Sequence, residues 1–308
     1  MTALGGPEVL EVREVERPAP IPTEVLVRVT AAAINPVDWK TRQHGGYQEA
    51  VGDPPLILGW DIAGVVEEID PDVTRFKPGD HVFGMPWFPR LAGGYAEYAT
   101  SPARQLARTP QALSDAQAGG LPLAGLTAWQ ALVDFADVGE GTRVLVHAAA
   151  GGVGHLAVQI AKARGSYVIG TAREEKHDFL RELGVDEPIE YTAGPFEEAV
   201  SDVDVVLDLV AGEEYGLRSL ETLREGGLWI CIPADVPDAV ADAAREQGKR
   251  ARSFLVEPDY AGLESLAALV EGGKLKVEID ETFPLAQAAE AHRRLEDGRA
   301  RGKIVLIP

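Results

Sequence analysis

The stretch RVLVHAAAGGVGHLAVQIAKARG, Arg143 to Gly165, contains the pattern that decides the fold. It begins with the apolar run Val144–Val146, which is typical of a strand buried on both faces. A turn of small residues, Ala149–Gly154, follows, and apolar residues then recur at helical spacing until Gly165, where the helix is expected to stop. A strand, a glycine-rich turn and a helix in this order predict a dinucleotide site, because the glycines let backbone N–H groups approach a pyrophosphate at a helix N-terminus.

The chain after this turn repeats the alternation of a short apolar run with a helical or polar crossover. The expected strands are Tyr167–Thr171, Ile189–Tyr191, Val203–Val210, Leu228–Ile232 and Phe254–Val256. Together with the first strand they predict an α/β fold with a doubly wound, six-stranded parallel sheet.

The composition excludes several classes of protein. The 308 residues suffice for two ordinary domains, and the net charge of −20 disfavours nucleic-acid partners. We expect neither a membrane span nor secretion, because the sequence has no long apolar run and no basic-then-apolar leader, and we therefore expect a cytoplasmic protein. The single cysteine, Cys231, lies in an apolar strand and is expected to be a buried, inert thiol.

The segments on either side of the parallel sheet have a different pattern. Residues 1–112 carry short strands separated by prolines and glycines, which is typical of an irregular antiparallel barrel; the expected strands are Val25–Val29, Ile62–Glu67 and His81–Phe83. Helical patterns cover Ser114–Ala136, with Ser114 as N-cap, and also Tyr260–Glu271 and Leu285–Asp297, and Gly302–Ile307 is the last strand. We expect a first domain over 1–112, a dinucleotide-binding domain over 113–258, and a segment 259–308 that returns to the first domain.

Several ordered motifs together resemble a known family, the zinc-free quinone oxidoreductase (zeta-crystallin-like) branch of the medium-chain dehydrogenase/reductase superfamily. They are GGPEVLEV (5–12), EVLVRVTAAAINPVDWK (24–40), LGWDIAGVVEEI (58–69), FKPGDHVFG (76–84), GGYAEYA (93–99), LPLAGLTAWQAL (121–132), VLVHAAAGGVGHLAVQIAK (144–162) and RGKIVLIP (301–308). The resemblance implies a GroES-like barrel domain beside a Rossmann domain, and a homodimer paired through Arg252–Val256.

The same resemblance, together with the chemistry of metal ligands, predicts that no metal is bound. The zinc-ligand positions of metal-containing members align with Asn35, the Gly59-Trp60-Asp61 motif and Leu123, where only Asp61 can serve as a ligand. The six histidines are scattered without ligand spacing. Oxidation of a simple alcohol then lacks a Lewis acid, whereas hydride delivery to a quinone or an α,β-unsaturated carbonyl needs none.

The residues after the second strand of the parallel sheet bear on the choice of nicotinamide cofactor. Ala172 is neutral where NAD-preferring folds place an acidic residue, and Arg173 and Lys176 can face a 2′-phosphate. Glu174 and Glu175 lie beside them and leave a ribose carboxylate as an alternative. We favour NADPH over NADH.

The resemblance implies further cofactor contacts. The expected cofactor-binding residues are Asn35, Thr127, Ala150, Gly151, Gly152, Val153, Gly154, Thr171, Ala172, Arg173, Lys176, Val210, Ala211, Ile232, Pro233, Gly302 and Lys303. Core packing is the alternative for Val210 and Ile232.

The expected reaction is hydride transfer to a small, neutral quinone or unsaturated carbonyl, in which positioning does most of the work. The candidate catalytic residues are Asn35, Asp38, Lys40 and Tyr47, and Trp60, Trp87, Phe88 and Phe254 are the candidate walls of a pocket for a flat acceptor. Local capping and packing are the alternatives for these side chains, and solvent is an alternative proton source. Two other functions stay open at this point: an enoyl or alkenal reductase of lipid or polyketide metabolism, and a catalytically vestigial NADPH-binding regulatory protein.

Overall fold

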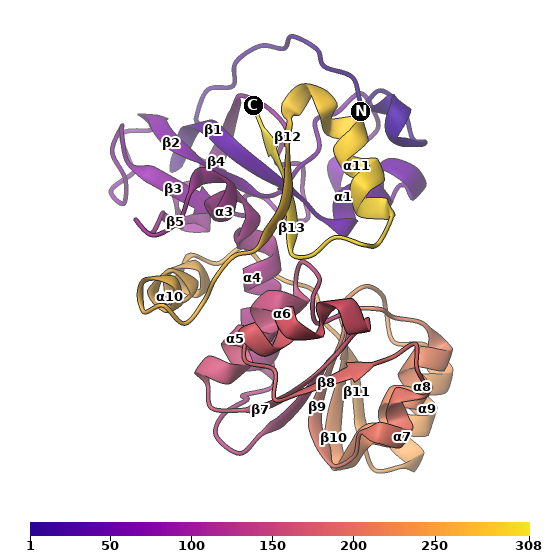
Figure 1. Ribbon diagram of the computed structural model, residues 1–308. Coiled ribbons are helices and arrows are strands. Elements are labelled where there is room, and N and C mark those ends of the chain that lie inside the picture. The colour runs from indigo at the N-terminus through magenta and orange to yellow at the C-terminus, as the bar shows by residue number, and fades with distance from the viewer. The chain divides into compact units, whose positions relative to one another are not determined.

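The computed structural model describes residues 1–308 and divides into two compact units (Figure 1). Unit 1 comprises Met1–Leu126, Glu257–Gly273 and Val277–Pro308, and unit 2 comprises Thr127–Val256 and Lys274–Lys276. Residues 113–126, which the sequence analysis assigned to the second domain, belong to unit 1. The reason is that α3 (Asp115–Gly120) packs against the sheet of that unit.

Unit 1 is built on a seven-stranded sheet in the order β12-β13-β1-β2-β3-β5, with β4 also paired to β1. The strands are β1 (Glu24–Ile34), β2 (Ile62–Ile69), β3 (His81–Gly84), β4 (Tyr98–Pro102), β5 (Leu106–Arg108), β12 (Ile279–Pro284) and β13 (Lys303–Ile307). Neighbours are antiparallel except β12 and β13. The C-terminal strand β13 pairs with β1, which confirms that the tail returns to the first part of the chain.

The core of unit 1 lies along β1. Val25, Val27 and Val29 are buried with Ile62 and Leu306 in one apolar cluster. Almost every residue of β1 is buried, because the strand is paired along both edges and covered on both faces.

The helices of unit 1 surround this sheet. They are α1 (Pro36–His44), α2 (Gln48–Val51), α3, α4 (Pro122–Trp129, whose last turn enters unit 2), α10 (Tyr260–Glu271) and α11 (Ala288–Glu296), with short 3-10 turns at Pro7–Val9, Ala103–Gln105 and Leu285–Gln287. Ser114 caps α3 as predicted, since its hydroxyl accepts from the Gln117 N–H. The helical region predicted over Ser114–Ala136 is interrupted at Leu121, because Pro122 has no N–H to continue the ladder.

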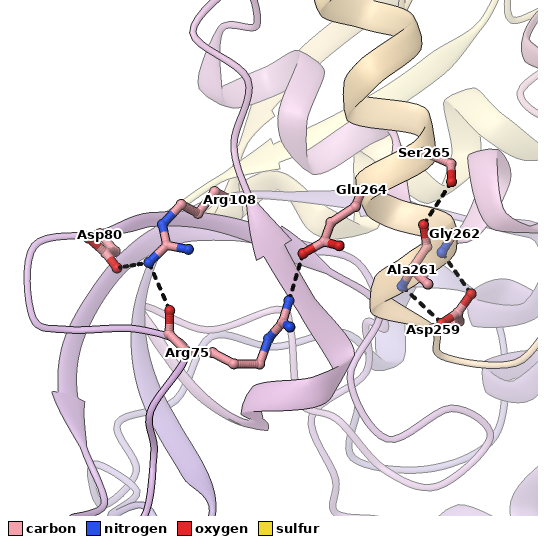
Figure 2. Close-up of polar contacts among 8 residues, drawn as sticks. All are labelled: Arg75, Asp80, Arg108, Asp259, Ala261, Gly262, Glu264 and Ser265. Atoms are coloured by element: carbon pink, nitrogen blue, oxygen red, sulfur yellow. Dashed lines mark hydrogen bonds and ion pairs between the residues drawn. The ribbon is translucent and has the colours of Figure 1, made fainter.

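Helix α10 begins at a side-chain cap, and an ion pair joins it to the rest of unit 1; both are drawn in Figure 2. The Asp259 carboxylate accepts from the N–H groups of Ala261 (2.9 Å) and Gly262 (2.7 Å). Glu264 accepts from Arg75 at 2.8 Å in the next turn of the helix. The cap satisfies first-turn donors that have no partner within the helix.

Unit 2 has the predicted six-stranded parallel sheet, in the order β11-β10-β9-β6-β7-β8. The strands are β6 (Arg143–Val146), β7 (Tyr167–Ala172), β8 (Glu187–Glu190), β9 (Val203–Asp208), β10 (Leu223–Cys231) and β11 (Arg250–Ser253). The first strand of the unit is central, and the strand order reverses between β6 and β9, which is the switch point where ligands bind in doubly wound folds.

Helices cover this sheet. They are α5 (Gly154–Ala163), α6 (His177–Glu182), α7 (Phe196–Ala199), α8 (Glu213–Thr222) and α9 (Asp238–Glu246), with a π-helical turn at Gln130–Phe135 and a 3-10 turn at Glu174–Lys176. Helix α5 packs on β6 and β7, while α8 and α9 lie side by side against β10 and β11 (Figure 1). Cys231 is buried at 1% exposure, as predicted.

The predicted position of the sixth strand was wrong. The strand is Arg250–Ser253, and the apolar segment Phe254–Val256 lies beyond its end. Pairing of Leu228 with Arg250 sets the register, and β11 has β10 as its one neighbour, so that polar residues suit this edge. The weak strand predicted at Ile189–Tyr191 is likewise displaced, to Glu187–Glu190.

No helix of the structure is long and apolar enough to span a membrane. The cytoplasmic location stays a prediction.

Candidate active site

The glycine-rich turn of unit 2 lies at the carboxyl end of β6 and is held by the neighbouring strand. The N–H of Ala148, a residue with φ of 47°, donates to the Thr171 hydroxyl at 3.2 Å, and the Ala149 N–H donates to the Thr171 carbonyl at 3.0 Å. A Cβ at Gly154, where α5 begins, would lie 2.3 Å from the Ala148 carbonyl oxygen, so only glycine fits. The His155 N–H donates to the Gly151 carbonyl and the Ala157 N–H to the Val153 carbonyl, so the turn runs directly into the N-terminus of this ten-residue helix, an arrangement suited to a pyrophosphate.

The remaining loop residues predicted to bind the cofactor lie in this turn. Ala150 is buried, and Gly151, Gly152 and Val153 are half-buried. Thr127 is buried in the last turn of α4.

A buried histidine contacts Thr171, the residue that holds the turn. His147 directly follows β6 and is fully buried, with Nδ1 3.2 Å from the Thr171 hydroxyl and Nε2 3.0 Å from the Ser219 hydroxyl. Burial lowers the pKa of His147 to about 3, and the charge of Arg218 adds to this, so the ring is neutral near pH 7. The sequence analysis noted this histidine only as one of six without metal-ligand spacing. Its position directly before the turn was the sequence signal for its contacts there.

The carboxyl ends of β7 and β8 bring together a cation and a phenol. Arg173, fully exposed after β7, donates to the Tyr191 hydroxyl at 3.4 Å, and the strand register pairs Ala172 with Glu190 directly before that tyrosine. Lys176 is half-buried one turn further on. Tyr191 was missed by the sequence analysis, because its proximity to Arg173 depends on the register of two strands.

A buried carboxylate shapes the turn after β9. Asp208 Oδ1 accepts from the N–H groups of Val210 (2.7 Å) and Ala211 (2.9 Å), and burial raises its pKa. Val210 is 47% exposed, so it is not a core residue of unit 2, and the core-packing alternative for Val210 is wrong. Ile232 and Pro233, after β10, are half-buried.

In unit 1, Asn35 lies at the centre of a buried polar network. Its N–H donates to Asp38 Oδ2 at 2.7 Å, and its side-chain Nδ2 donates to Asp61 Oδ2 at 2.8 Å. Its side-chain oxygen accepts from the ammonium of Lys303. Both ends of the Asn35 amide are therefore engaged inside the protein, and the residue is 1% exposed.

Asp61 and Lys303 form the charged part of this network. The second oxygen of Asp61 accepts from the Leu123 N–H at 2.7 Å, and Lys303 Nζ lies 3.7 Å from Asp61 Oδ2. Both side chains are almost completely buried. Burial raises the pKa of Asp61 and lowers the pKa of Lys303, and their mutual attraction opposes both shifts.

Asp38 is the second buried carboxyl group of the network. Burial raises the pKa of Asp38 to about 7, the nearby charge of Asp61 raises it as well, and the hydrogen bond from the Asn35 N–H opposes the change. A side-chain hydrogen bond with Tyr95 also opposes the rise. Burial therefore lets Asp38 keep its proton to a higher pH than an ordinary aspartate does.

Three further buried side chains, all missed by the sequence analysis, lie behind this network. Arg42 donates to His292 Nδ1 at 3.0 Å and to Glu296 at 2.8 Å, and His292 Nε2 is 3.3 Å from the Tyr95 hydroxyl. Because a guanidinium can only donate, the neutral His292 ring carries its hydrogen on Nε2. Burial lowers the pKa of His292 to about 3.

The structure brings together part of the predicted aromatic pocket. Phe88 packs edge-on against Trp60, with ring centroids 5.6 Å apart, and against Tyr47, with centroids 5.4 Å apart. Trp60 is fully buried and donates to the Arg90 carbonyl at 2.7 Å. Trp87 is half-buried in the same loop with φ of 63°.

Two further predicted residues make other contacts. Phe254 belongs to unit 2, where it packs against Phe135 with ring centroids 5.9 Å apart. Lys40 is half-buried on α1, with its ammonium 6.0 Å from the Trp39 ring.

Comparison with known proteins assigns the chain to a family. Residues 21–111 match the alcohol dehydrogenase GroES-like domain, and residues 183–306 match a domain described as zinc-binding dehydrogenase. The chain is 35% identical to 2-haloacrylate reductase of Burkholderia sp over 327 residues, covering 99% of this chain and 96% of that protein.

Solved structures agree with this assignment. The quinone oxidoreductase from Coxiella burnetii superposes with a TM-score of 0.92 at 38% identity, covering 100% of this chain and 97% of that one. Mycobacterial Rv1454c complexed with NADPH superposes with a TM-score of 0.89 at 28% identity, covering 100% and 98%. The chain belongs to the medium-chain dehydrogenase/reductase superfamily, in its zinc-free quinone oxidoreductase branch.

The residues of unit 1 do not fit a zinc ion, although one domain description contains that metal. Nowhere in the structure do three histidine, cysteine or acidic side chains group as ligands would. At the positions aligned with zinc ligands, Asn35 and Leu123 instead donate hydrogen bonds to Asp61, and the Lys303 ammonium lies beside them. The Lys303 ammonium therefore lies among the residues that would have to act as ligands of a metal ion.

Proposed function

We propose that this chain is a zinc-independent reductase that transfers hydride from NADPH to a quinone or another activated unsaturated carbonyl. The observation that carries the proposal is the combination of a dinucleotide turn at Ala148–Gly154 with an Asn35–Asp61 site that has no metal-ligand set. A hydride acceptor that is already electron-poor needs no Lewis acid. The family of quinone oxidoreductases supports this acceptor class, as does the relative named for reduction of a haloacrylate.

The preference for NADPH is proposed from the end of β7. Arg173 and Tyr191 together offer a charged donor and a hydroxyl at the place where doubly wound folds bind the ribose of the adenosine half. A guanidinium suits a 2′-phosphate, because its planar N–H groups match phosphate oxygens. Lys176 lies one turn beyond Arg173 and can add a second positive charge.

When bound, NADPH would supply a hydride, which carries both electrons of the reduction, and a proton would complete the reduced acceptor as the cofactor becomes NADP+. The turn and the N-terminus of α5 would hold the pyrophosphate, and positioning would account for most of the rate. Val210 and Ile232 limit the space at the carboxyl ends of β9 and β10. The proton comes from solvent, because Asn35 is saturated by internal hydrogen bonds and Asp38 is fully buried.

We also propose a homodimer that forms through the edge of the unit 2 sheet. Strand β11 has a free edge, and Leu255, directly after it, is 51% exposed. Phe135 is 46% exposed and packs against Phe254 beside that edge. A partner strand would satisfy the edge and cover these side chains.

The test is consumption of NADPH and NADH by the purified protein against a panel of quinones, enones, alkenals and enoyl thioesters. The proposal expects turnover with quinones or simple enones and a preference for NADPH. Turnover restricted to enoyl thioesters or long alkenals would instead indicate a reductase of lipid or polyketide metabolism. Tight NADPH binding without oxidation by any acceptor would refute the enzyme assignment and favour a regulatory protein.

A further inference from the structure

Lys303 is a buried lysine whose contacts are all internal. It is 3% exposed, and its ammonium donates to the Asn35 side-chain oxygen and to the Ile34 carbonyl, the latter at 3.4 Å. Asp61 Oδ2 lies 3.7 Å away. Lysines are almost never buried to this degree unless they are paired, because an ammonium loses its hydration.

The placement of Lys303 is imposed by the backbone before it. Gly302 has φ of 79°, and a Cβ there would lie 2.3 Å from the Glu278 carbonyl oxygen. The Lys303 N–H donates to that same carbonyl at 2.9 Å. The backbone at the start of β13 is therefore held tightly against Glu278, the residue just before β12.

The surroundings of the ammonium contain two buried carboxyl groups. Asp38 and Asp61 are both fully buried, and the charge of Lys303 acts on both carboxyl groups. The Asn35 amide joins Lys303 to Asp61, since it accepts from the lysine and donates to the aspartate. Without Lys303, Asp61 would be a buried carboxylate compensated only by neutral hydrogen-bond donors.

We propose that Lys303 is the built-in cation of this site: its ammonium supplies the positive charge that a zinc ion supplies at the aligned positions of metal-containing members, and it positions Asn35 and Asp61. This role differs from the direct cofactor contact that the family resemblance suggested for Lys303. It does not depend on which acceptor the protein reduces, because it concerns the charge balance inside unit 1. Lys303 is therefore a positioning residue.

A double-mutant cycle on Lys303 and Asp61 tests the proposal by thermal unfolding of the full chain. Removing one partner of a buried ion pair is strongly destabilising, so K303M and D61N should each lower Tm by roughly 5–15 °C. In the double variant neither charge of the Lys303–Asp61 pair is left without the other, and the Asn35 amide can rotate by 180° to accept from the amide introduced by D61N. The loss of Tm in the double variant should therefore be clearly smaller than the sum of the two single losses.

Two controls separate charge from general packing. The first control is the matched ion pair of Lys162 and Asp186, which are 2.8 Å apart but about one-third exposed. In a K162M and D186N cycle, the Tm loss of the double variant should equal the sum of the two single losses, because an exposed ion pair contributes little. K303R keeps the positive charge and should recover part of the Tm that K303M loses.

Additive losses in the Lys303–Asp61 cycle would overturn the proposal, as would a K303M protein with the wild-type Tm. If K303M does not fold, the double variant and K303R provide the test, because the proposal expects both of them to fold. A double variant that aggregates, while D61N alone folds, would refute the proposal.

Discussion

The side-chain amide of Asn35 donates to Asp61 Oδ2 at 2.8 Å, and both residues are buried in unit 1. The other oxygen of Asp61 accepts from the Leu123 N–H, so Asp61 joins Asn35 and Leu123, two of the positions that align with zinc ligands. A site of this kind is organised by hydrogen bonds and by the Lys303 charge. Asn35 therefore acts in the organisation of the site, since neither end of its amide is left to bind a substrate.

Replacement of Arg173 by alanine tests the cofactor preference. Arg173→Ala should raise the KM for NADPH about tenfold and leave the KM for NADH unchanged, because only NADPH carries the 2′-phosphate. Steady-state kinetics with both cofactors measures this. Arg181→Ala, which removes another exposed arginine of the same region, is the control and should change neither value. An equal rise for both cofactors would show that Arg173 does not recognise the phosphate.

A methyl group at Gly154 tests the turn. Gly154→Ala places a Cβ 2.3 Å from the Ala148 carbonyl oxygen, so the start of α5 must move. We expect the Kd for NADPH, measured by fluorescence titration, to rise more than about tenfold, since the helix N–H groups leave the pyrophosphate position. Gly139→Ala is the control, because a Cβ there meets no atom within 4 Å. Unchanged NADPH affinity in Gly154→Ala would place the cofactor elsewhere.

Asp38 should make the stability of the protein depend on pH. Its pKa is about 7 in the folded protein and near 4 in an unfolded chain, so the folded state binds the proton more tightly. The stabilisation is fully present below pH 4 and is lost as the pH rises through 7. The groups that act on Asp38 are the Asn35 N–H, Asp61, Tyr95 and Lys303.

Asp38→Asn removes this titration and keeps an oxygen for the Asn35 N–H. The difference in unfolding free energy between the wild type and Asp38→Asn should therefore fall by about 2–3 kcal/mol from pH 5 to pH 8. Urea unfolding at a series of pH values measures it, and the subtraction cancels the titration of His147 and His292. A difference that is constant with pH would show that the pKa of Asp38 is not raised.

A charge beside the edge strand tests the dimer. Leu255→Glu places a carboxylate next to β11, where a partner strand would have to desolvate it, so the mass measured by analytical ultracentrifugation should fall from dimer to monomer. Val12→Glu, at a position 68% exposed in unit 1, should leave the mass unchanged. A wild-type protein that is already monomeric contradicts the proposed dimer.

Local patterns predicted most of the secondary structure. Strand β6, the turn and α5 follow from residues within a single stretch, and Tyr260–Glu271 is helical over the predicted range. The failure at Phe254–Val256 has a clear origin: the apolar run follows the strand, with Leu255 exposed and Val256 buried, and the true strand is defined by its pairing with β10. Edge strands need little apolar sequence, because one flank has no neighbour.

The sequence analysis predicted which residues belong to the candidate site, but not what they contact. Asn35, Asp38, Trp60 and Lys303 were named, but the sequence analysis assigned them to catalysis, a pocket and cofactor binding. The structure shows all four buried, with Trp60 donating to the Arg90 carbonyl and the other three in one network. Whether a polar side chain is buried depends on which distant segments pack against it. The sequence pattern of one segment does not contain that information.

The sequence by itself determined the parallel sheet of unit 2 and the dinucleotide turn, because these follow from local periodicity and turn chemistry. It also determined the family, through the resemblance of ordered motifs along the whole chain. Only the tertiary structure decided that Lys303 meets Asn35, 268 residues earlier in the chain, and that Asp61 lies beside both. Charges buried together must compensate one another, and which charges those are is set by the packing of β1 against β13.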